Sequence, residues 1–455
     1  MLEMLRSLHL GQALMPEGWR RDVRLTLDAG VIATVETGVA ARPGDACHAI
    51  GVPGLANVHS HAFQRAMSGR AERRGPGDDS FWSWRETMYR FALKMSPGQV
   101  EAVAAQAYAE MLEAGFTRVG EFHYLHHAPD GRPYADVAEM SARIAAAAAH
   151  THIGLTLLPV FYAHSGFGGA PPDTVQRRFV CDLDRYGRLV EGARRVAASL
   201  DGANIGLAPH SLRAVTQEQL AEVAVMAGSS PLHIHVAEQV AEVEACLAWS
   251  GARPVDYLLD HADADARWCL IHATHMTFSE ARRAAASGAT IGLCPITEAN
   301  LGDGIFDALT FLAHDGRFGV GTDSNVQIGL ADELRMLEYS QRLARRARNV
   351  IAAPQGSTGR ALFDGALRGG AAALGRGACG FVIGADADVV TLREDALGAI
   401  GRNGDGLLDC WIFSGGAFVD SVIARGRRVV TDGRHVARDR IRDRFRTAMH
   451  ELLAD

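Results

Sequence analysis

The sequence lacks the features that mark membrane, secreted and nucleic-acid-binding proteins. It has no run of about 18 apolar residues to span a bilayer, and its start, MLEMLRSLHLGQALMPEG, lacks the apolar core of a signal peptide. The net charge is −7 and the arginines are scattered, so there is no basic stripe to neutralise phosphates. The seven cysteines are widely spaced without a C-x-x-C pair, which suits a reducing cytoplasm. We therefore expect a cytoplasmic protein with no membrane or nucleic-acid partner, whose ligand is a small molecule.

Both ends of the chain carry short alternating segments typical of small β-strands. Near the start these segments are VRLTL and VIATVET, separated by Gly, Asp and Pro, a pattern suited to antiparallel strands. Near the end they are ADADVVTL, SVIARGRRVV and TDGRHV, followed by the helical stretch RDRIRDRFRTAMHELLA. We expect residues 1–50 and 375–455 to form one discontinuous small β-sandwich domain with a C-terminal helix.

Between the two ends, strand-like apolar runs alternate with longer stretches that have apolar residues at helical spacing. This alternation is typical of parallel βα units, which place the class as α/β. The expected strands are GVPGLANV, TRVGEF, IGLTLLPV, NIGLAP, LHIHV, WCLIHA, TIGLCP and FGVGT. Eight such strands are the number that closes a (β/α)8 barrel of the TIM type. We expect residues 51–374 to form this barrel as a metal-dependent catalytic domain.

Polar side chains gather just after these strands. In a (β/α)8 barrel the carboxyl ends of the strands form one rim, so residues far apart in sequence meet there. The rim residues, in chain order, are His59, His61, Tyr124, His210, Arg213, His235, Glu238, His272 and Asp323. The sequence therefore predicts one site built from most of the strands.

Four of these residues form a set suited to a metal ion. Alternate residues of a strand point the same way, so His59 and His61 can present two imidazoles to one metal. His235 and Asp323 would complete three imidazoles and one carboxylate, a set that suits Zn²⁺, or Fe²⁺ in a related enzyme. His233 shares the direction of His235 and is the rival ligand, although we expect it to be a hydrogen-bonded neighbour.

A metal with an open position makes hydroxide available near neutral pH, and an acid or base must then move its proton to a leaving amine. Glu238, His272 and Asp323 are the candidates for this proton transfer. Glu238 follows His235 by three residues, where the strand gives way to a loop. His275, in the sequence HATH, is the rival of His272.

With these residues assembled, the chain resembles the amidohydrolase superfamily. The matching features are HSH after the first strand, HIHVAE, IHATH, GTDS and the split β domain, and they cover essentially the whole length. Within the superfamily, NVHSHAFQRAMSG, FWSWRETMY, GEFHYLHH, APHSLRAV, HVAEQVAEVEAC, CPITEANLGDGIF and LEYSQRLARR resemble the formimidoylglutamate deiminase family. That resemblance implies hydrolysis of N-formimidoyl-L-glutamate to N-formyl-L-glutamate and ammonia, a step of histidine degradation.

The resemblance also implies roles for individual residues. It makes His59, His61, His235 and Asp323 the ligands of one zinc ion per chain, with Glu238 and His272 transferring protons. It implies substrate contacts through Gln64, Arg85, Tyr124, His210 and Arg213. Two arginines suit a dicarboxylate, because a guanidinium binds a carboxylate through two parallel hydrogen bonds. Relatives are commonly dimers, so a homodimer is expected.

Two positions near these residues have less certain roles. Family members often have histidine shortly after the metal-binding aspartate, where this chain has Asn325, and this departure puts any role of that position in doubt. Arg65, close to the first two histidines, is expected to be structural.

Three other functions would account for parts of the same sequence pattern. A deaminase of a purine or pyrimidine would share the metal and acid/base residues; Phe81, Trp82 and Trp84 keep it open, although a Trp-rich loop is more often a packed lid. A binuclear hydrolase needs a carboxylated lysine at a strand end, and the only lysine, Lys94, lies in a helical stretch instead. A non-catalytic binding protein should have lost ligands or the acid, and here all are present.

Overall fold

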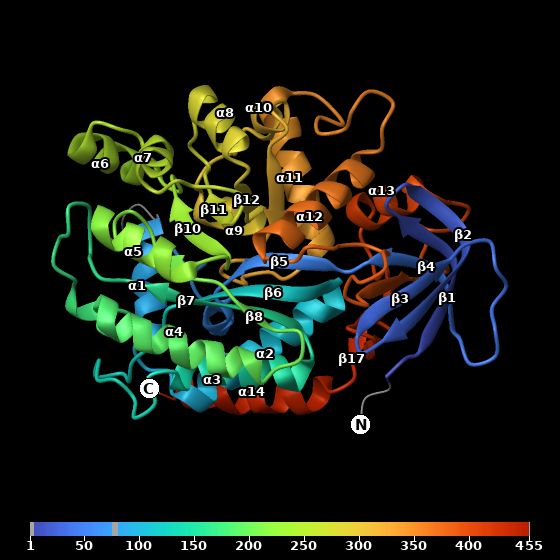
Figure 1. Cartoon of the computed structure of the whole chain (residues 1–455), viewed down its shortest axis with the longest axis horizontal. Helices are drawn as coiled ribbons and strands as arrows, with labels where there is room; N and C mark the ends of the chain where they lie inside the picture. The colour runs from blue at the N-terminus through green and yellow to red at the C-terminus, as the bar shows by residue number, and fades with distance from the viewer. Residues whose placement is uncertain (1–3, 75–80, 455) are drawn as a thin grey trace.

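The structure is a computed structural model that describes residues 4–74 and 81–454. Within these residues the strands form two sheets, one of nine strands in the middle of the chain and one of eight strands from its two ends. Figure 1 shows the nine-stranded sheet ringed by helices, with the other sheet beside it at the right. None of the described helices is long and apolar enough to cross a membrane.

The central sheet is a closed barrel of parallel strands. Its strands are β5 (Leu55–Ser60), β6 (Phe116–His123), β7 (Gly154–Phe161), β8 (Asn204–Ile205), β9 (Ala208–Pro209), β10 (Leu232–Val236), β11 (Trp268–His272), β12 (Thr290–Leu293) and β13 (Arg317–Val320). The short strands β8 and β9 both pair with β7, and a bridge from Leu207 to Leu232 joins them to β10. The last strand pairs with the first through Val320 and Asn57. The predicted (β/α)8 barrel is therefore confirmed, and its fourth strand is divided into the two short strands β8 and β9.

The strands form where apolar runs are continuous, because parallel strands are buried on both faces. Every residue of β6, β7, β10 and β11 is buried, including the histidines. The outer helices predicted from apolar spacing are α2 (Pro97–Ala114), α3 (Glu139–Thr151), α4 (Leu183–Ala198), α5 (Gln217–Ala227) and α11 (Leu330–Arg345). Helix α2 begins at a capping box formed by Ser96 and Gln99 and ends at Gly115 in a left-handed conformation, as its sequence dictates.

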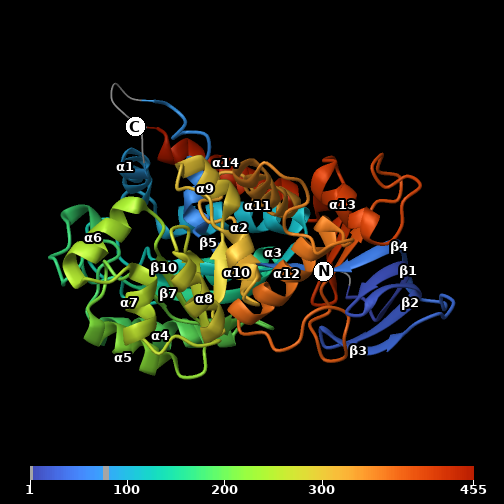
Figure 2. The ribbon, with the colours of Figure 1, turned by 90° about the horizontal axis from the view of Figure 1, so that it is seen from above.

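Further helices were not assigned from the sequence. They are α1 (Phe81–Ala92), α6 (Val240–Ser250), α7 (Pro254–His261), α8 (Phe278–Ser287), α9 (Pro295–Leu301), α10 (Ala308–Leu312), α12 (Thr358–Ala373) and α13 (Asp405–Phe413), with the short 3-10 helices η1 (Ala62–Met67) and η2 (Thr174–Gln176). Figure 2 shows α6, α7 and α8 on the barrel side of the molecule, away from the strands of the second sheet. Lys94 lies in the turn just after α1 rather than inside a helix.

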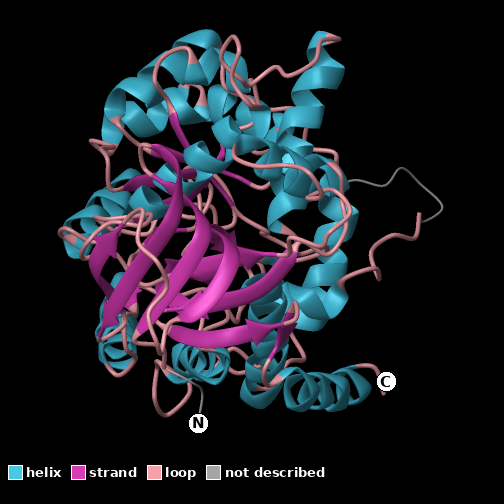
Figure 3. Ribbon diagram, turned by 90° about the vertical axis from the view of Figure 1, so that its right-hand side faces the viewer, coloured by secondary structure: helices cyan, strands magenta, loops and turns pink. Residues whose placement is uncertain are grey.

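The second sheet joins the two ends of the chain. Its strands, in spatial order, are β17 (Arg434–His435), β16 (Arg427–Thr431), β15 (Val419–Ala424), β14 (Val389–Leu392), β4 (Ala46–Pro53), β1 (Ser7–Met15), β2 (Gly18–Asp28) and β3 (Val31–Glu36). Side chains of β1–β3 and of β14 and β15 share one apolar core, so the sheet folds over itself like a sandwich (Figure 3). The pairing is not wholly antiparallel as expected: β1 and β4 run parallel, so the chain between β3 and β4 crosses back along the sheet before it pairs with β1.

The C-terminal helix α14 (Arg438–Leu452) leaves this sheet and packs along α2 on the outside of the barrel (Figure 1). Arg444 forms an ion pair with Glu101 of α2 at 2.7 Å, and Gln99 donates a hydrogen bond to Glu451 at 3.0 Å. The helix that we expected in the small domain therefore contacts the barrel. The division of the chain at residues 50 and 375 remains our prediction.

Candidate active site

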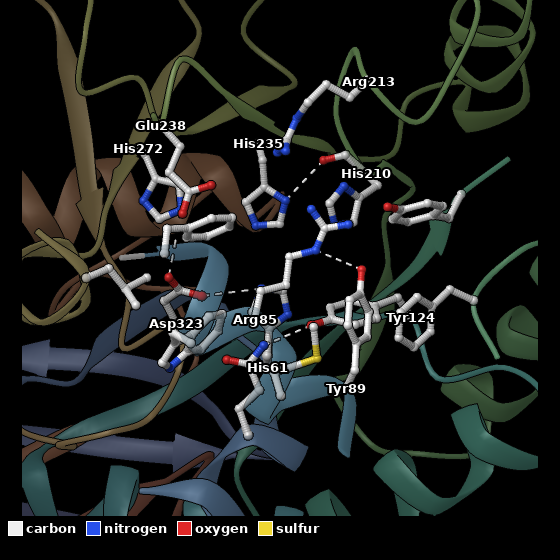
Figure 4. Close-up of a pocket in the computed structure, with 17 residues that line it drawn as sticks. His61, Arg85, Tyr89, Tyr124, His210, Arg213, His235, Glu238, His272 and Asp323 are labelled. Atoms are coloured by element: carbon white, nitrogen blue, oxygen red, sulfur yellow. Dashed lines mark hydrogen bonds and ion pairs between the residues drawn. The ribbon is translucent and has the colours of Figure 1, made fainter. Parts of the chain in front are cut away.

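A pocket of about 610 Å³ opens at the carboxyl ends of the barrel strands (Figure 4). The predicted site residues that line it are His61, Gln64, Arg85, Tyr124, His210, Arg213, His235, Glu238, His272 and Asp323. His59 is fully buried directly behind them. The structure thus brings all the predicted site residues together, as the shared rim of a barrel requires.

Three imidazoles meet at one point of this pocket. Nε2 of His59 lies 3.2 Å from Nε2 of His61 and 3.0 Å from Nε2 of His235. Oδ1 of Asp323 lies 3.5 Å from Nε2 of His59 and 3.3 Å from Nε2 of His61. The four side chains come from β5 and the residue that follows it, from β10 and from the residues just after β13, so only the closed barrel can assemble them.

Hydrogen bonds fix which ring nitrogens face this point. Nδ1 of His61 donates to the carbonyl of Phe122 at 2.9 Å, and Nδ1 of His235 donates to the carbonyl of His210 at 3.0 Å. Because a carbonyl only accepts, both Nδ1 atoms carry the proton and both Nε2 atoms present lone pairs. Burial lowers the pKa of His59 to about 3 and also lowers the pKa values of His61 and His235, so all three rings are neutral.

These residues fit a divalent metal ion. Lone pairs that face one another at 3.0–3.2 Å repel unless a cation lies between them. Two ligands of a tetrahedral zinc, each 2.0–2.1 Å from the ion, lie about 3.4 Å apart, which matches the separations observed here. Neutral imidazoles and an ionised carboxylate are the forms that bind metal, and contacts with His59 hold the pKa of Asp323 well below its usual range against the opposing effect of burial.

Unusual backbone geometry turns the catalytic candidates into the pocket. Ala237, His272 and Asp323 have φ values of 52°, 68° and 43°, in the left-handed region that residues other than glycine and asparagine rarely adopt. Each of these residues lies at or just after the end of a barrel strand. Such strain is characteristic of functional sites, where the surrounding structure holds it in place.

Glu238 and His272 face each other at the edge of the metal-binding group. Oε1 of Glu238 lies 3.8 Å from Nε2 of His272, and the same nitrogen lies 3.8 Å from Oδ2 of Asp323. Burial raises the pKa of Glu238 to about 7. Burial alone would lower the pKa of His272, but the neighbouring carboxylates outweigh it and raise that pKa to about 10. Near neutral pH Glu238 can therefore gain or lose a proton, while His272 stays protonated.

Arg85 and Arg213 bring positive charge to the pocket without a matching carboxylate. Within residues 4–74 and 81–454, neither guanidinium lies within ion-pair distance of an acid, and Nε of Arg213 is buried without a hydrogen-bond partner. Nε of Arg85 donates to the hydroxyl of Tyr89 at 2.8 Å, and its guanidinium lies over the rings of Trp82 and Tyr89. Both side chains are half-buried, and charges shielded from water are usually paired, so this pair indicates an anionic ligand.

Three polar residues of the pocket, Gln64, Tyr124 and His210, are held in place by their neighbours. Nε2 of Gln64 donates to the hydroxyl of Tyr124 at 2.8 Å, which leaves Oε1 of Gln64 buried and unpartnered. The ring of His210 packs edge-on against Tyr162 with centroids 4.5 Å apart. Burial lowers the pKa of His210 well below its usual range, so its ring offers one donor and one acceptor.

Of the aromatic side of the pocket, the sequence pointed only to Phe81 and Trp84, as possible stacking partners of a heterocycle. Phe81, Trp84, Met88 and Tyr89 of α1 line it together with Tyr162, Phe179 and Leu301. The segment we took for a Trp-rich loop is a helix, and its pocket residues follow the helical i, i+3, i+4, i+7 spacing, with Phe81, Trp84, Arg85 and Met88 in turn. That spacing was the signal that could have identified both the helix and the lining.

The residues of uncertain role lie outside the pocket lining. Nε2 of His233 donates to the carbonyl of Ala373 at 2.8 Å, in agreement with the expected hydrogen-bonded neighbour. His275 does not line the pocket. Arg65 forms an ion pair with Glu110 at 2.7 Å and bonds the carbonyl of Asn325, in agreement with a structural role.

Asn325 is fully buried, and its side chain forms hydrogen bonds that connect the ends of two strands. It accepts a hydrogen bond from the hydroxyl of Thr322 at 2.6 Å and donates to Ser60 at 3.2 Å and to the carbonyl of Asp323 at 3.0 Å. Its φ of 54° is left-handed, a conformation that asparagine tolerates well. Asn325 thus joins the residues after β13 to the end of β5, beside the metal-binding group.

Comparison with known proteins agrees with this geometry. The sequence model of the amidohydrolase family matches residues 50–429, and that of the N-terminal domain of formimidoylglutamate deiminase matches residues 5–49. The formimidoylglutamate deiminase of Pseudomonas aeruginosa is 48% identical over 99% of this chain and 100% of its own. The 8-oxoguanine deaminase of the same species is 30% identical over 86% of this chain and 84% of its own.

Solved structures show the same architecture. An amidohydrolase from Brucella melitensis superposes with a TM-score of 0.96 at 58% identity, covering 98% of this chain and 100% of that one. A zinc complex of atrazine chlorohydrolase from Arthrobacter aurescens, at 22% identity, superposes with a TM-score of 0.83 over 97% of this chain and 99% of that one, and shares the fold. The chain therefore belongs to the amidohydrolase family of enzymes, on its formimidoylglutamate deiminase branch.

Proposed function

We propose that the protein hydrolyses N-formimidoyl-L-glutamate to N-formyl-L-glutamate and ammonia, as a step of histidine degradation. The observation that carries this proposal is the pair of arginines, Arg85 and Arg213, which have no ion-pair partner among the described residues and line the pocket that holds the metal-binding group. Glutamate brings two carboxylates, one for each guanidinium. The name of the Pseudomonas relative supports the same substrate.

The metal in this proposal is one zinc ion per chain, with Fe²⁺ as the alternative. His59, His61, His235 and Asp323 would hold it. Bound zinc supplies Lewis acidity, which lowers the pKa of water to about 7 and provides a nucleophile near neutral pH.

The proton transfers are assigned to Glu238, His272 and Asp323. Glu238 takes a proton from the attacking water and delivers it to the departing nitrogen, since its pKa near 7 allows both steps. His272 stays protonated and stabilises the negative charge that develops on oxygen. Asp323, whose Oδ2 lies 3.8 Å from Nε2 of His272, helps to hold the His272 ring in place. The water oxygen adds to the formimidoyl carbon while Glu238 carries one water proton to the terminal nitrogen. Glu238 then carries the remaining hydroxyl proton to the same nitrogen as its bond to carbon breaks, and that nitrogen leaves as ammonia.

Substrate binding is assigned to both walls of the pocket. Arg85 and Arg213 bind the two carboxylates, and Gln64, Tyr124 and His210 contact the polar backbone of the substrate. The unpartnered Oε1 of Gln64 is an acceptor suited to a substrate N–H. The aromatic residues of α1 exclude water from the bound chain.

A second candidate is deamination of a purine or pyrimidine. The aromatic lining by Phe81 and Trp84 favours it, since a heterocycle stacks on such rings. A neutral heterocycle would leave both half-buried guanidinium groups without an anionic ligand, so the dicarboxylate is preferred.

Ammonia release from N-formimidoyl-L-glutamate, compared with N-formimidoyl-L-aspartate, guanine and cytosine, tests the proposal. Efficient turnover of the glutamate derivative alone is the expected result. Turnover of guanine or cytosine without turnover of the glutamate derivative would overturn it in favour of the second candidate.

We further propose that the protein works in the cytoplasm as a homodimer. The seven cysteines are all free, which suits a reducing compartment. Light scattering of the purified protein would measure the mass, and a monomer across micromolar concentrations would contradict the dimer.

A further inference from the structure

Glu298 is a buried carboxylate behind the catalytic pair, and no residue role described so far includes it. It lies in α9, with only 5% of its surface exposed, and it does not line the pocket. Its Oε1 lies 3.3 Å from Nδ1 of His272 and accepts a hydrogen bond from the backbone N–H of Cys294 at 2.9 Å. One carboxylate oxygen thus ties the ring of His272 to the start of a helix.

This contact decides how His272 presents its ring. With Nδ1 facing Glu298, the opposite nitrogen, Nε2, faces Glu238 and Asp323 at 3.8 Å each. A carboxylate only accepts hydrogen bonds, so Nδ1 must carry a proton whenever this contact forms. The φ of 68° at His272 places the residue in a strained backbone conformation, so contacts of the ring must hold the orientation.

We propose that Glu298 is a positioning residue. Its carboxylate accepts a hydrogen bond from Nδ1 of His272 and thereby directs Nε2 toward the reacting atoms. Glu298 does not touch the substrate and acts only through His272. The proposal rests on the proposed deiminase reaction for its kinetic test, but its structural test does not need any substrate.

The chain offers a matched control in Glu333. This glutamate is fully buried, and its Oε2 accepts a hydrogen bond from the backbone N–H of Ile296, in the first turn of the same helix α9. It supports the helix as Glu298 does, but it has no contact with His272 among the described residues. A purely structural role for Glu298 would therefore be shared by Glu333.

The kinetic experiment compares E298A, E298Q and E333A in the zinc-loaded protein. Loss of a carboxylate that orients a catalytic histidine typically costs roughly 10- to 100-fold, so E298A should lower kcat by that factor with KM within about twofold. E298Q should retain most of the activity, because its amide oxygen can accept the same two hydrogen bonds. E333A should leave kcat within about twofold.

A double-mutant cycle separates action through His272 from any other action. In the H272N background, E298A should cause no further loss of kcat, because the ring that it positions is gone. A full additional loss in that background, or a kcat of E298A equal to that of the wild type, would overturn the proposal. If E298A fails to fold, the same comparison is made with E298Q, whose smaller loss should also vanish beside H272N.

NMR spectroscopy of protein labelled with ¹⁵N-histidine provides a readout that does not depend on turnover. The His272 signals are identified by their loss in H272N, and the wild type should show a proton on Nδ1 with Nε2 as the other nitrogen facing the pocket. In E298A the Nδ1 proton should lose its hydrogen bond to the carboxylate and its signal should move upfield, whereas E333A should keep the wild-type signal. A wild-type ring with unprotonated Nδ1 would overturn the proposal. A protein that passes this test but releases no ammonia from the formimidoyl substrate would overturn the proposed function alone.

Discussion

Oδ1 of Asp323 lies 3.3 Å from Nε2 of His61, although the two residues follow the last and the first strand of the barrel. The backbone supports this approach, because Ser60 and Asp323 form a β-bridge where β5 and β13 meet. The metal-binding group therefore depends on the closure of the barrel rather than on a local motif. Predictions about the metal follow from this arrangement.

The histidines at positions 235 and 233 should differ in their effect on metal binding. His235 presents Nε2 to the other two imidazoles, whereas His233 bonds the carbonyl of Ala373. H235Q should lose most of the bound zinc, as measured by elemental analysis after dialysis, because one of four ligands is removed. H233Q, two residues earlier on the same strand, should retain about one zinc per chain. Equal zinc content in the two variants would show that the ligand is misassigned.

Glu238→Gln should lower kcat by roughly 10²- to 10⁴-fold, the usual contribution of a general acid or base. The amide cannot accept and return the proton, but it has nearly the same shape as the carboxyl group. The zinc content should stay near one per chain, which separates this effect from loss of the metal. Unchanged turnover in a steady-state ammonia assay would reject the role of Glu238.

Arg85→Met and Arg213→Met should each raise KM with a smaller effect on kcat. Loss of a hydrogen-bonded contact to a charged group costs about 1.5–3 kcal/mol, which corresponds to roughly 10- to 150-fold in binding. Arg90→Met is the matched control, because Arg90 lies on the same helix but is exposed, does not line the pocket and donates a hydrogen bond to Thr87. If both pocket variants keep the wild-type KM, the ligand is not a dicarboxylate.

Asn325→Ala should destabilise the protein by about 2 kcal/mol, because it removes the acceptor of the Thr322 hydroxyl proton and the donor to the Ser60 hydroxyl in a buried site. Urea unfolding of the zinc-loaded protein measures this change. Asn349→Ala is the control, since Asn349 also has a left-handed φ but is exposed. If Asn349→Ala lowers the stability as much as Asn325→Ala does, the effect comes from the left-handed backbone conformation and not from the hydrogen bonds of Asn325.

The barrel and the metal-binding group could be predicted because each depends on a regular pattern. Buried parallel strands such as LHIHV are continuous in apolar character, and the barrel brings their polar end residues to one rim. The ligand choice at His235 also followed from the sequence, since Glu238 marks where the strand ends.

The remaining features depend on contacts that no local pattern encodes. Helix α1 is rich in aromatic residues, which have modest helix propensity, so the segment was taken for a loop despite its spacing. Glu298 touches His272 from a short helix that follows a different strand, and only the packing of α9 against the barrel brings them together. The parallel pairing of β1 with β4 likewise depends on how two distant strands meet.

The pairing of β5 with β13, the first and last strands of the barrel, affects when the newly made chain can bind its metal. The two histidines at the end of β5, His59 and His61, leave the ribosome early, but Asp323 emerges after most of the barrel has been synthesised. Partial chains can therefore offer imidazoles but not the complete set of ligands, and pairing of segments so far apart is slow. We expect tight metal capture to follow barrel closure after translation, rather than to guide folding from its start.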